Sequence, residues 1–248
     1  MIAACLQLSI RLCKPRENLA RALAMAAEAV ERGAEILVFP ELFLAGFCYS
    51  QDLSDHTPYP SLGPLRSFVE EHGCLIVGSI VDGRLNRGFC LDESGIGFQD
   101  KIHPFGTEKV HFDGGELISP IKTSRGAVGL EICYDLRFPE VARKLALSGA
   151  DFLVTIAQFP PSRGYVWQSL CRARAIENQI HHIGCNGAGP DFSGGSVILD
   201  PWGRAVVEAG AEEGTILADL DLADRDCARR EIPALADRRP EIYRSENI

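Results

Sequence analysis

The sequence predicts an α/β fold in which β-sheets are covered by helices on their outer faces. Strand-like and helix-like segments alternate from the start of the chain, a pattern typical of sheets flanked by helices. Runs rich in apolar residues, such as residues 36–39 and 151–156, indicate strands that are buried on both faces. Short strand-like segments with hairpin turns follow toward the end of the chain, which indicates that the sheets continue there.

The first half of the chain is expected to alternate strands and helices before it enters a long loop. Apolar residues recur at helical spacing between Leu19 and Val30, and Gly33 then supplies a stop. Residues 103–125 are rich in Gly, His and Pro, and a loop of that length is usually functional or disordered. The expected elements are strands over 1–10, 36–39 and 74–80, helices over 19–30 and 65–71, and two strands that bracket the turn at 93–95.

The second half continues this alternation and then changes to hairpins. The segment Asp200-Pro-Trp-Gly203 provides a hairpin turn. From Ala223 onward the tail is charged and interrupted by proline, so it is too polar for the core and is expected to pack on a neighbour. The expected elements are a strand that ends at 132, a helix over 139–147, a strand over 151–156, a helix over 166–180, and strands near 181–186, 195–199, 204–208 and 214–220.

Length and composition favour one domain and exclude several classes of partner. The 248 residues are 46% hydrophobic and 24% charged, and no change of composition marks a linker, so we expect a single domain over residues 1–248. A net charge of −9 without a basic stripe argues against nucleic acid. No apolar run approaches the roughly 20 residues that span a bilayer, and the first ten residues lack a secretory leader. We therefore expect a cytoplasmic protein that does not attach to a membrane.

The nine cysteines, an odd number, lie mostly within strand-like or helical segments. Buried free cysteine behaves as a small hydrophobic residue, so we expect reduced thiols in a cytosolic protein. No C-x-x-C pair occurs, and His181-His182 has no cysteine or carboxylate at ligand spacing, so no metal site is expected. Cys133 differs from the other eight because it stands where an apolar strand breaks into a turn and then a helix.

Three apolar segments end at residues whose side chains can carry chemistry: Glu41, Lys101 and Cys133. Ligands in open α/β sheets bind outside the strand ends, so three such ends offer an acid, an amine and a thiol to one pocket. A thiol becomes a strong nucleophile once a base takes its proton, which Glu41 can do if its carboxylate is desolvated. Lys101 and the backbone N–H of Tyr134 can stabilise the oxyanion of a tetrahedral intermediate.

Each of these residues, taken singly, also fits a structural role. A cysteine at a strand end is often a filler of the core, and a glutamate after Phe-Pro is usually a solvated cap. Lys101 beside Asp100 also fits a surface ion pair that contributes little energy. The sequence around each residue is what favours chemistry.

Three segments around these residues resemble the three signatures of the nitrilase superfamily of carbon–nitrogen hydrolases. They are Phe39-Pro-Glu-Leu-Phe-Leu-Ala-Gly-Phe47, Asp100-Lys-Ile-His-Pro-Phe105 and Ile132-Cys-Tyr-Asp-Leu-Arg-Phe-Pro-Glu140. The similarity continues in the expected order through residues 172–179, 194–196, 200–203 and 232–240. The resemblance therefore covers nearly the whole chain.

The resemblance implies a four-layer α-β-β-α sandwich and a Glu-Lys-Cys triad made of Glu41, Lys101 and Cys133, with no metal and no organic cofactor. It implies a cysteine-dependent amidohydrolase that cleaves a small carboxamide to an acid and ammonia through a Cys133 thioester. The motif around Cys133 is similar to that of ω-amidase-like members. A nitrilase or an N-carbamoyl amide hydrolase with the same triad is an alternative, and so is a catalytically silent binding protein on the same fold.

The resemblance also implies further site residues. Many members carry a second glutamate in the loop after the lysine, and Glu108 matches it; we expect it to position the substrate or to hold Lys101 and the thiol in register. Phe47 and Phe159 stand where pocket walls are expected. Arg163 is a candidate for binding a substrate carboxylate, with a surface position at a helix start as the alternative.

Other family features concern assembly and stability. The resemblance implies at least a dimer, with the 223–248 tail and the 138–180 helices at an interface. Arg172, Arg174 and Glu177 are expected to form a structural ion-pair network.

Two positions depart from the family pattern. Pro104 replaces the leucine more usual after the histidine, and it is expected to stiffen the Lys101 loop. The segment 183–190 is unusually rich in glycine and is expected to widen the pocket, which leaves the acyl group of the substrate open.

Overall fold

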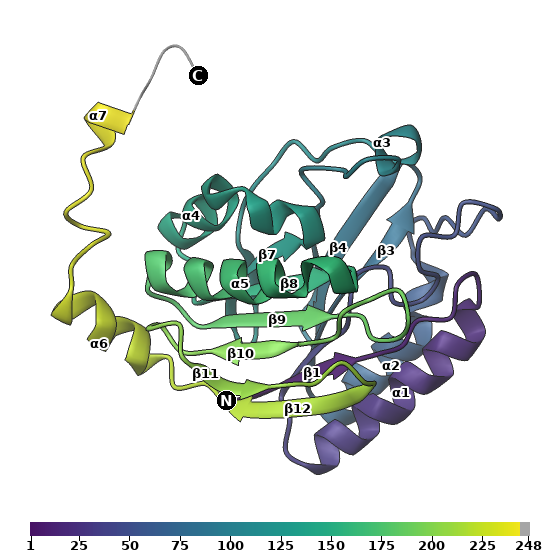
Figure 1. Ribbon diagram of the computed structural model, residues 1–248. Coiled ribbons are helices and arrows are strands. Elements are labelled where there is room, and N and C mark those ends of the chain that lie inside the picture. Colours follow the sequence, from purple (N-terminus) through teal and green to yellow (C-terminus); the bar gives the residue numbers. More distant parts are fainter. Residues whose placement is uncertain (244–248) are drawn as a thin grey trace.

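The computed structural model describes residues 1–243 and contains two six-stranded sheets that pack face to face (Figure 1). The first sheet has the order β12-β1-β2-β3-β4-β5, and the second has the order β11-β10-β9-β8-β7-β6. The strands of the first sheet are β1 (Ile2–Gln7), β2 (Ile36–Val38), β3 (Leu75–Asp82), β4 (Leu85–Asp92), β5 (Gly95–Asp100) and β12 (Gly214–Asp219). Those of the second are β6 (Ile121–Thr123), β7 (Gly126–Ile132), β8 (Phe152–Ala157), β9 (His182–Asn186), β10 (Val197–Leu199) and β11 (Ala205–Glu208).

Helices cover the outer face of each sheet, so the molecule has four layers. The α-helices among residues 1–243 are α1 (Pro15–Glu31), α2 (Gly63–His72), α3 (Glu108–His111), α4 (Pro139–Leu147), α5 (Gly164–Asn178), α6 (Ala223–Glu231) and α7 (Pro240–Tyr243). Apolar residues of α1 and α2 pack on the first sheet, and those of α4 and α5 pack on the second. A separate apolar cluster lies between the sheets and includes Ile36 and Val38 from one sheet and Ile132 from the other. The predicted α-β-β-α sandwich is therefore confirmed.

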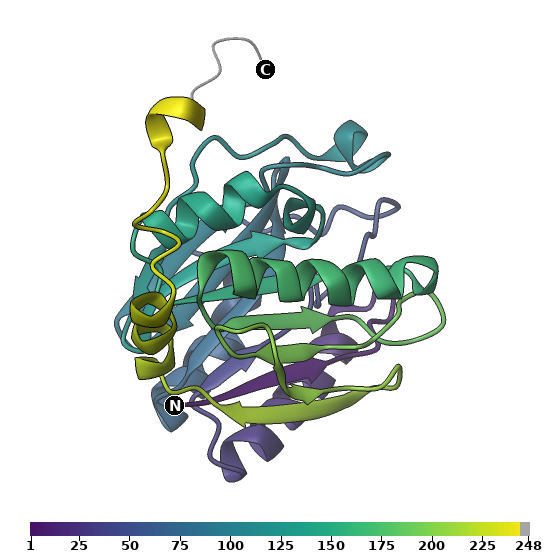
Figure 2. The same cartoon turned by 60° about the vertical axis from the view of Figure 1, so that its left-hand side comes forward.

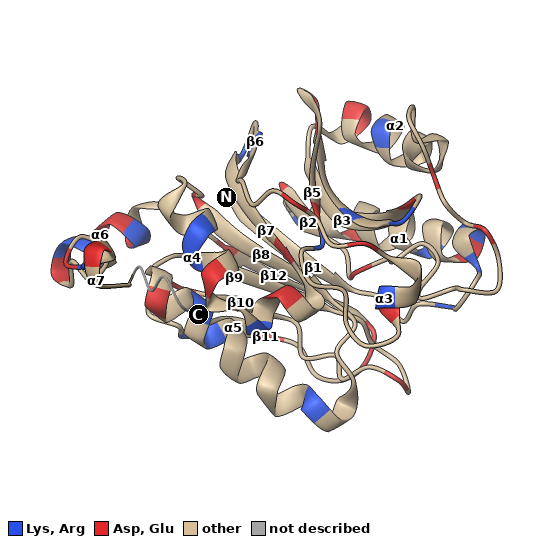
Figure 3. Cartoon of the chain, turned by 90° about the horizontal axis from the view of Figure 1, so that it is seen from above, with Lys and Arg blue, Asp and Glu red and all other residues tan. Residues whose placement is uncertain are grey.

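The central strands are apolar on both faces because each is covered on both sides. In β2, Ile36 and Val38 face the opposite sheet, whereas Leu37 faces the helices. Strands β1, β2 and β3 run parallel, as do β7, β8 and β9, with helices in the connections. Charged residues occur in the outer helices and in the loops, as the view from above shows (Figure 3).

The order of elements agrees with the sequence prediction, with one main difference. The segment 103–125, which was expected to be irregular, contains the short helix α3 and the edge strand β6. Strand β6 pairs antiparallel with β7, so this stretch is anchored to the second sheet. The sequence pattern that would indicate α3 and β6 is weak because these elements are only four and three residues long.

The expectation of nine reduced cysteines is wrong, because Cys13 and Cys48 form a disulfide. The bridge joins the loop after β1 to the loop that carries Phe47, and Cys13 N–H also donates to Ala45 O at 2.9 Å. Cys227 is an exposed free thiol, so not all remaining cysteines are buried. Spacing alone gives no signal for this pair, since the two residues are 35 positions apart.

The charged tail packs in part on its own chain. In α6, Arg225 pairs with Asp151 at 2.7 Å, and Gln179 Nε2 donates to Ala228 O and Ile232 O. Beyond α6 the chain runs away from the sheets to α7, as two views show (Figures 1 and 2). The last five residues of the predicted tail interface, 244–248, lie outside the described residues. No helix among residues 1–243 is long and apolar enough to cross a membrane.

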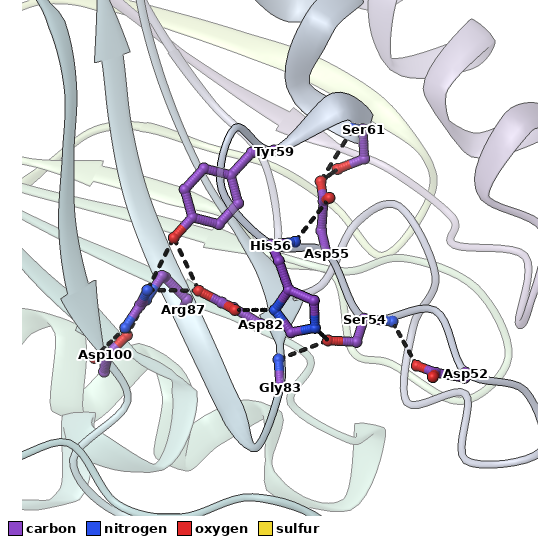
Figure 4. Close-up of polar contacts among 10 residues, drawn as sticks. All are labelled: Asp52, Ser54, Asp55, His56, Tyr59, Ser61, Asp82, Gly83, Arg87 and Asp100. Carbon is purple, nitrogen blue, oxygen red and sulfur yellow. Dashed lines mark hydrogen bonds and ion pairs between the residues drawn. The ribbon is translucent and has the colours of Figure 1, made fainter.

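A polar network on the outer side of the first sheet ties the loop 52–61 to β3, β4 and β5 (Figure 4). At its centre, Asp82 accepts hydrogen bonds from Tyr59 Oη at 2.9 Å and from Arg87, and it contacts His56 Nδ1 at 2.9 Å. Arg87 Nε also donates to Asp100 at 2.8 Å. We call Asp82, Arg87, Asp100, His56 and Tyr59 the outer network.

Candidate active site

The three residues expected to carry chemistry follow strand ends that meet near the contact between the two sheets. Glu41 follows β2 and Lys101 follows β5 in the first sheet, whereas Cys133 follows β7 in the second. The sheets approach closely here, because a Cβ at Gly88 of β4 would lie 2.9 Å from Ile132 Cδ1. A glycine at this position therefore lets β4 lie directly against the strand that ends at Cys133.

The backbone turns sharply at the acid and at the thiol. Cys133 itself has φ +50°, and Leu42, the residue after Glu41, has φ +47°. Residues with side chains seldom adopt this left-handed region, and such strain is common at functional sites. At Cys133 the turn separates β7 from the 3₁₀ helix Cys133–Arg137, so the side chain leaves the strand direction and faces a cavity.

Lys101 is the centre of a buried charge cluster that we call the inner cluster: Glu41, Lys101 and Glu108. Lys101 Nζ donates to Glu41 Oε1 and to Glu108 Oε2, each at 2.7 Å. Glu41 is 0% exposed and Lys101 is 1% exposed, so water does not screen these contacts. One ammonium thus serves two carboxylates.

Only one of the two oxygens of the Glu41 carboxylate accepts hydrogen bonds from the described residues. Asn86 Nδ2 donates to Glu41 Oε1 at 2.8 Å, beside the bond from Lys101, and Gln158 Nε2 donates to the main-chain oxygen of Glu41 at 2.8 Å. The other oxygen, Glu41 Oε2, is buried and has no hydrogen-bond partner among residues 1–243. A buried acceptor without a partner is uncommon in proteins, and an ionised oxygen in this position can accept a proton.

The charges of the cluster set the protonation states around the thiol. Burial raises the pKa of Cys133 well above its ordinary value, the Glu41 carboxylate raises it further, and Lys101 opposes both. Burial by itself lowers the pKa of Lys101, but attraction to Glu41, Cys133 and Glu108 outweighs it, so the pKa is raised and the ammonium stays charged. Burial, then repulsion from Glu41, raises the pKa of Glu108 to about 7.

A cavity of about 320 Å³ opens in front of Cys133. Glu108 also lines it, whereas Glu41 and Lys101 are buried and are not among its lining residues. All four residues expected to contact the substrate border this cavity, and the full lining is Phe47, Tyr49, Phe105, Thr107, Glu108, Cys133, Tyr134, Arg137, Gln158, Phe159, Pro160 and Arg163. Five of these twelve residues are aromatic and three are charged: Glu108, Arg137 and Arg163.

Two arginines line the cavity, and the guanidinium group of each lies over an aromatic ring. Arg137 Cζ lies 5.8 Å from the centre of the Phe159 ring, and Arg163 Cζ lies 5.2 Å from that of Phe105. The one acid of the lining, Glu108, is already paired with Lys101. The two arginines thus add positive charge to the cavity lining, which suits a carboxylate.

Asp135 joins the segment that carries Lys101 to the segment that carries Cys133. Its carboxylate is buried and accepts the backbone N–H groups of Ile102, His103 and Ile132 at 3.2, 2.8 and 3.3 Å. His103 Nδ1 lies 2.8 Å from the same carboxylate. This clamp fixes the residues beside the ammonium and the thiol relative to each other.

Sequence reasoning missed several residues of the site. Arg137 lies in the motif that contains Cys133, so the signal was present there. Asn86 and Gln158 carry no local signal, because each reaches Glu41 only through the fold.

Two structural expectations need correction. Arg174 pairs with Glu177 at 2.9 Å, but Arg172 pairs with Glu208, so they do not form one network. The glycine-rich segment 183–190 does not line the cavity; Asn186 Oδ1 accepts Phe159 N–H at 2.7 Å and supports this wall from behind. Within residues 1–243, no group of three or more His, Cys, Asp or Glu side chains is placed to hold a metal ion.

Comparison with known proteins gives one family. The sequence model of the carbon–nitrogen hydrolase family matches residues 2–230. The chain is 36% identical to the 2-oxoglutaramate amidase of Bacillus subtilis (strain 168), over 96% of this chain and 98% of that protein. It is 32% identical to the omega-amidase NIT2 of Mus musculus, over 93% of this chain and 92% of that protein.

A solved structure shows the same architecture. It is a glutamate-to-glutamine mutant of the amidase from Nesterenkonia sp. AN1, with covalent addition of the acetamide moiety of fluoroacetamide at the active-site cysteine. The two structures superpose with a TM-score of 0.86 at 30% identity, over 98% of this chain and 95% of that chain.

Proposed function

Because the chain belongs to the carbon–nitrogen hydrolase family, in the ω-amidase-like branch of the nitrilase superfamily, we propose that it hydrolyses the terminal amide of a small dicarboxylic or keto acid. The observation that carries this is the cavity, which offers a thiol beside an acid–ammonium cluster and two arginines. The thiol suits the amide, and the arginines suit a carboxylate on the same molecule. The names of the two relatives above support such a substrate.

In the first half of the reaction, Glu41 takes the proton of the Cys133 thiol as sulfur attacks the amide carbon. We assign the proton to Oε2, since Oε1 is held by Lys101 and Asn86. The oxygen of the tetrahedral intermediate gains negative charge, which the Lys101 ammonium and the backbone N–H of Tyr134 stabilise. Glu41 then returns the proton to nitrogen, the carbon–nitrogen bond breaks, and ammonia leaves a thioester on Cys133.

In the second half, water hydrolyses the thioester. Glu41 takes a proton from the water as its oxygen attacks the thioester carbon, and the same groups stabilise the second oxyanion. The carbon–sulfur bond then breaks, the thiolate regains its proton from Glu41, and the carboxylic acid leaves. Glu108 keeps Lys101 in place during both halves, with its carboxylate 2.7 Å from the ammonium.

Substrate profiling tests this function. Ammonia release is measured for glutaramic acid, for butyramide as its analogue without the carboxylate, for a nitrile of similar size and for an N-carbamoyl amino acid. We expect glutaramic acid to have the highest kcat/KM, about 10- to 100-fold above butyramide, the range for one charge-assisted contact. Faster turnover of the nitrile or of the carbamoyl compound would favour those alternatives, and no turnover of any probe would favour a silent binding protein.

Matched variants connect the result to the proposed residues. Cys133→Ala should abolish turnover and leave the fold intact, as thermal unfolding would show, whereas the buried thiol variant Cys171→Ala should keep kcat because Cys171 lies away from the cavity. Arg137→Leu and Arg163→Leu should each reduce the preference for glutaramic acid over butyramide.

Acyl transfer, not alkylation, is the informative reaction at the thiol. In the Nesterenkonia variant the cysteine carries an acetamide moiety although a glutamate is replaced by glutamine. Reaction with such an electrophile is therefore a poor measure of the base. Thioester formation from an amide needs the proton transfers proposed for Glu41.

We also propose that residues 1–248 form one domain, that the enzyme acts in the cytoplasm and that it assembles at least as a dimer. Exposed apolar side chains support the assembly: Tyr165 and Ile176 on α5, Leu147 at the end of α4, and Ile242 and Tyr243 on α7. Sedimentation at micromolar concentration tests it, and a monomer of 27.0 kDa as the single species would contradict it.

A further inference from the structure

A buried asparagine outside the cavity contacts the carboxylate that is proposed to act as the base. Asn86 lies in β4 and is 1% exposed. Its side-chain Nδ2 donates to Glu41 Oε1 at 2.8 Å, the same oxygen that accepts Lys101 Nζ at 2.7 Å. Asn86 does not line the cavity, and its side chain donates its hydrogen bond to Glu41.

The main chain of Asn86 holds the other partner of the cluster. Lys101 N–H donates to Asn86 O at 2.9 Å, where β4 and β5 end their pairing. One residue thus bonds Glu41 through its side chain and Lys101 through its backbone. Its position is fixed on the other side by β3, because Asn86 pairs with Val81.

The amide of Asn86 can serve Glu41 in only one orientation. The carboxylate accepts hydrogen bonds and cannot donate them when ionised, so the NH₂ group must face it. Asn86 Oδ1 is buried and has no partner among residues 1–243, which agrees with an amide whose contact with Glu41 is its main polar contact. Asn86 thus donates a hydrogen bond to Glu41 through Nδ2 although its own Oδ1 remains unpaired, which costs folding free energy.

A neutral donor suits this position for a physical reason. A cation beside Oε1 would add to Lys101 and make the carboxylate a weaker base, and an anion would repel it. An amide N–H fixes the carboxylate without a full charge. It also completes Oε1, which then has two donors, so that Oε2 is the oxygen left for a proton.

We propose that Asn86 is a positioning residue that orients Glu41 so that Oε2 faces the thiol and serves as the base, and that it couples this orientation to the position of Lys101. This rests on the proposed function, in which Glu41 is the base. Asn86 acts through Glu41 and does not touch the reacting atoms.

The test compares Asn86→Leu with a matched control in the same enzyme. Asn178→Leu is the control, because Asn178 is also fully buried, donates one hydrogen bond, to Arg174 O, and has an unpartnered Oδ1 within residues 1–243, but it lies at the end of α5. We expect Asn86→Leu to lower kcat for glutaramic acid about 10- to 100-fold, the range for one charge-assisted hydrogen bond. KM should stay within about threefold, since the residue is outside the cavity. Asn178→Leu should keep kcat within about threefold.

A second variant keeps the test decisive if Asn86→Leu does not fold. Asn86→Asp has nearly the same shape, but its ionised carboxylate cannot donate to Glu41, whereas its protonated form can. Its kcat relative to the wild type should therefore rise as the pH is lowered from 8.5 to 6. A ratio that is the same at all pH values would overturn the proposal, because a structural role alone does not depend on that proton.

Glu41→Gln separates failure of this inference from failure of the proposed function. If Glu41→Gln is inactive and Asn86→Leu keeps full kcat, the positioning role is wrong and the function stands. The same conclusion holds if Asn86→Leu is only less stable to heat. If Glu41→Gln keeps normal kcat, the base is assigned wrongly, and the role of Asn86 falls with it.

Discussion

The inner cluster and the outer network are built on neighbouring residues of the same two strands, yet they differ in how completely they are satisfied. Asn86 and Arg87 are consecutive in β4, and Asp100 and Lys101 are consecutive at the end of β5. Successive side chains of a strand point to opposite faces. Asn86 and Lys101 therefore face the second sheet, whereas Arg87 and Asp100 face the side of the loop 52–61 (Figure 4).

In the outer network every charge has a partner. Arg87 is shared by Asp82 and Asp100, and both oxygens of Asp82 accept hydrogen bonds or contact His56. Ser54 Oγ lies 3.5 Å from His56 Nε2, so Ser54, His56 and Asp82 are in contact in the order Ser–His–Asp. Ser54 Oγ also accepts a hydrogen bond from Gly83 N–H, so the serine is tied to the backbone of the neighbouring turn. The contacts anchor a loop at the surface.

In the inner cluster one oxygen has no partner. Glu41 and Lys101 are fully buried, and Glu41 Oε2 is unpaired among the described residues 1–243. Other buried side-chain atoms of the described chain, such as Glu131 Oε1, also lack a partner, so this feature counts only together with the contacts around it. The difference teaches that ion pairs alone do not distinguish the two regions. The inner cluster differs because it holds an unpaired carboxylate oxygen and because the charge of Glu41 acts on the Cys133 thiol.

The largest effect is expected when the inner acid is changed and an outer acid serves as the control. Glu41→Gln should lower kcat for glutaramic acid about 10³-fold, because a general base contributes about 10² to 10⁴. Asp82→Asn in the outer network should keep kcat within about threefold. Steady-state ammonia release measures both, and equal losses in the two variants would remove the distinction between the regions.

A smaller effect is expected from the pH, through Glu108. Its pKa is raised to about 7 by burial and by repulsion from Glu41, so its carboxylate is ionised mainly above that pH. The ionised form holds Lys101, and activity should therefore fall as the pH drops through about 7. The pH profile of kcat/KM between 5.5 and 8.5 should show this limb, and Glu108→Gln should lack it and be about 10- to 100-fold less active at pH 8. If kcat/KM of Glu108→Gln still fell in the same way below pH 7, the titrating group would not be Glu108.

A change in the outer network should affect stability more than activity. Arg87→Leu leaves Asp82 and Asp100 without their shared cation, which should cost about 2 kcal/mol of unfolding free energy. Urea unfolding measures this loss. Since Arg87 faces away from the cavity, kcat should stay within about threefold. A loss of kcat as large as that of Asn86→Leu would mean that the two faces of β4 are not independent.

The smallest effect is expected from the disulfide on the outer surface. Cys13–Cys48 holds the segment next to Phe47 and Tyr49, both of which line the cavity. Reduction with a dithiol should loosen this wall and raise KM about threefold without changing kcat. Cys13→Ser/Cys48→Ser should have the higher KM before reduction and not respond to the dithiol, whereas a wild-type KM in this variant would show that the bridge does not shape the cavity.

The sequence could predict the elements whose signal is local. Glu41, Lys101 and Cys133 each follow a strand, and the segments around them carry the family motifs, so their convergence on one region of the fold was expected. Phe47 and Phe159 were also expected at the cavity, and both line it.

The remaining features depend on tertiary contacts and could not be predicted in the same way. Asn86 reaches Glu41 only because β4 is brought to the end of β2 through β3, and nothing in its neighbouring residues indicates this. Cys13 and Cys48 lie in two loops that are distant in sequence, and only the fold brings them together. The short elements α3 and β6 are too brief for their periodicity to be recognised.

The central claim, that the unpaired oxygen of Glu41 activates Cys133 for acyl transfer, is tested most directly by thioester formation in a single turnover. Wild-type enzyme and Glu41→Gln are mixed rapidly with glutaramic acid and quenched with acid, and the peptide that contains Cys133 is analysed by mass spectrometry. The wild type should carry the acyl group on Cys133 within the first turnover, and Glu41→Gln should acquire it about 10³-fold more slowly. An equal rate in the variant, or an acyl group on another residue, would contradict the account.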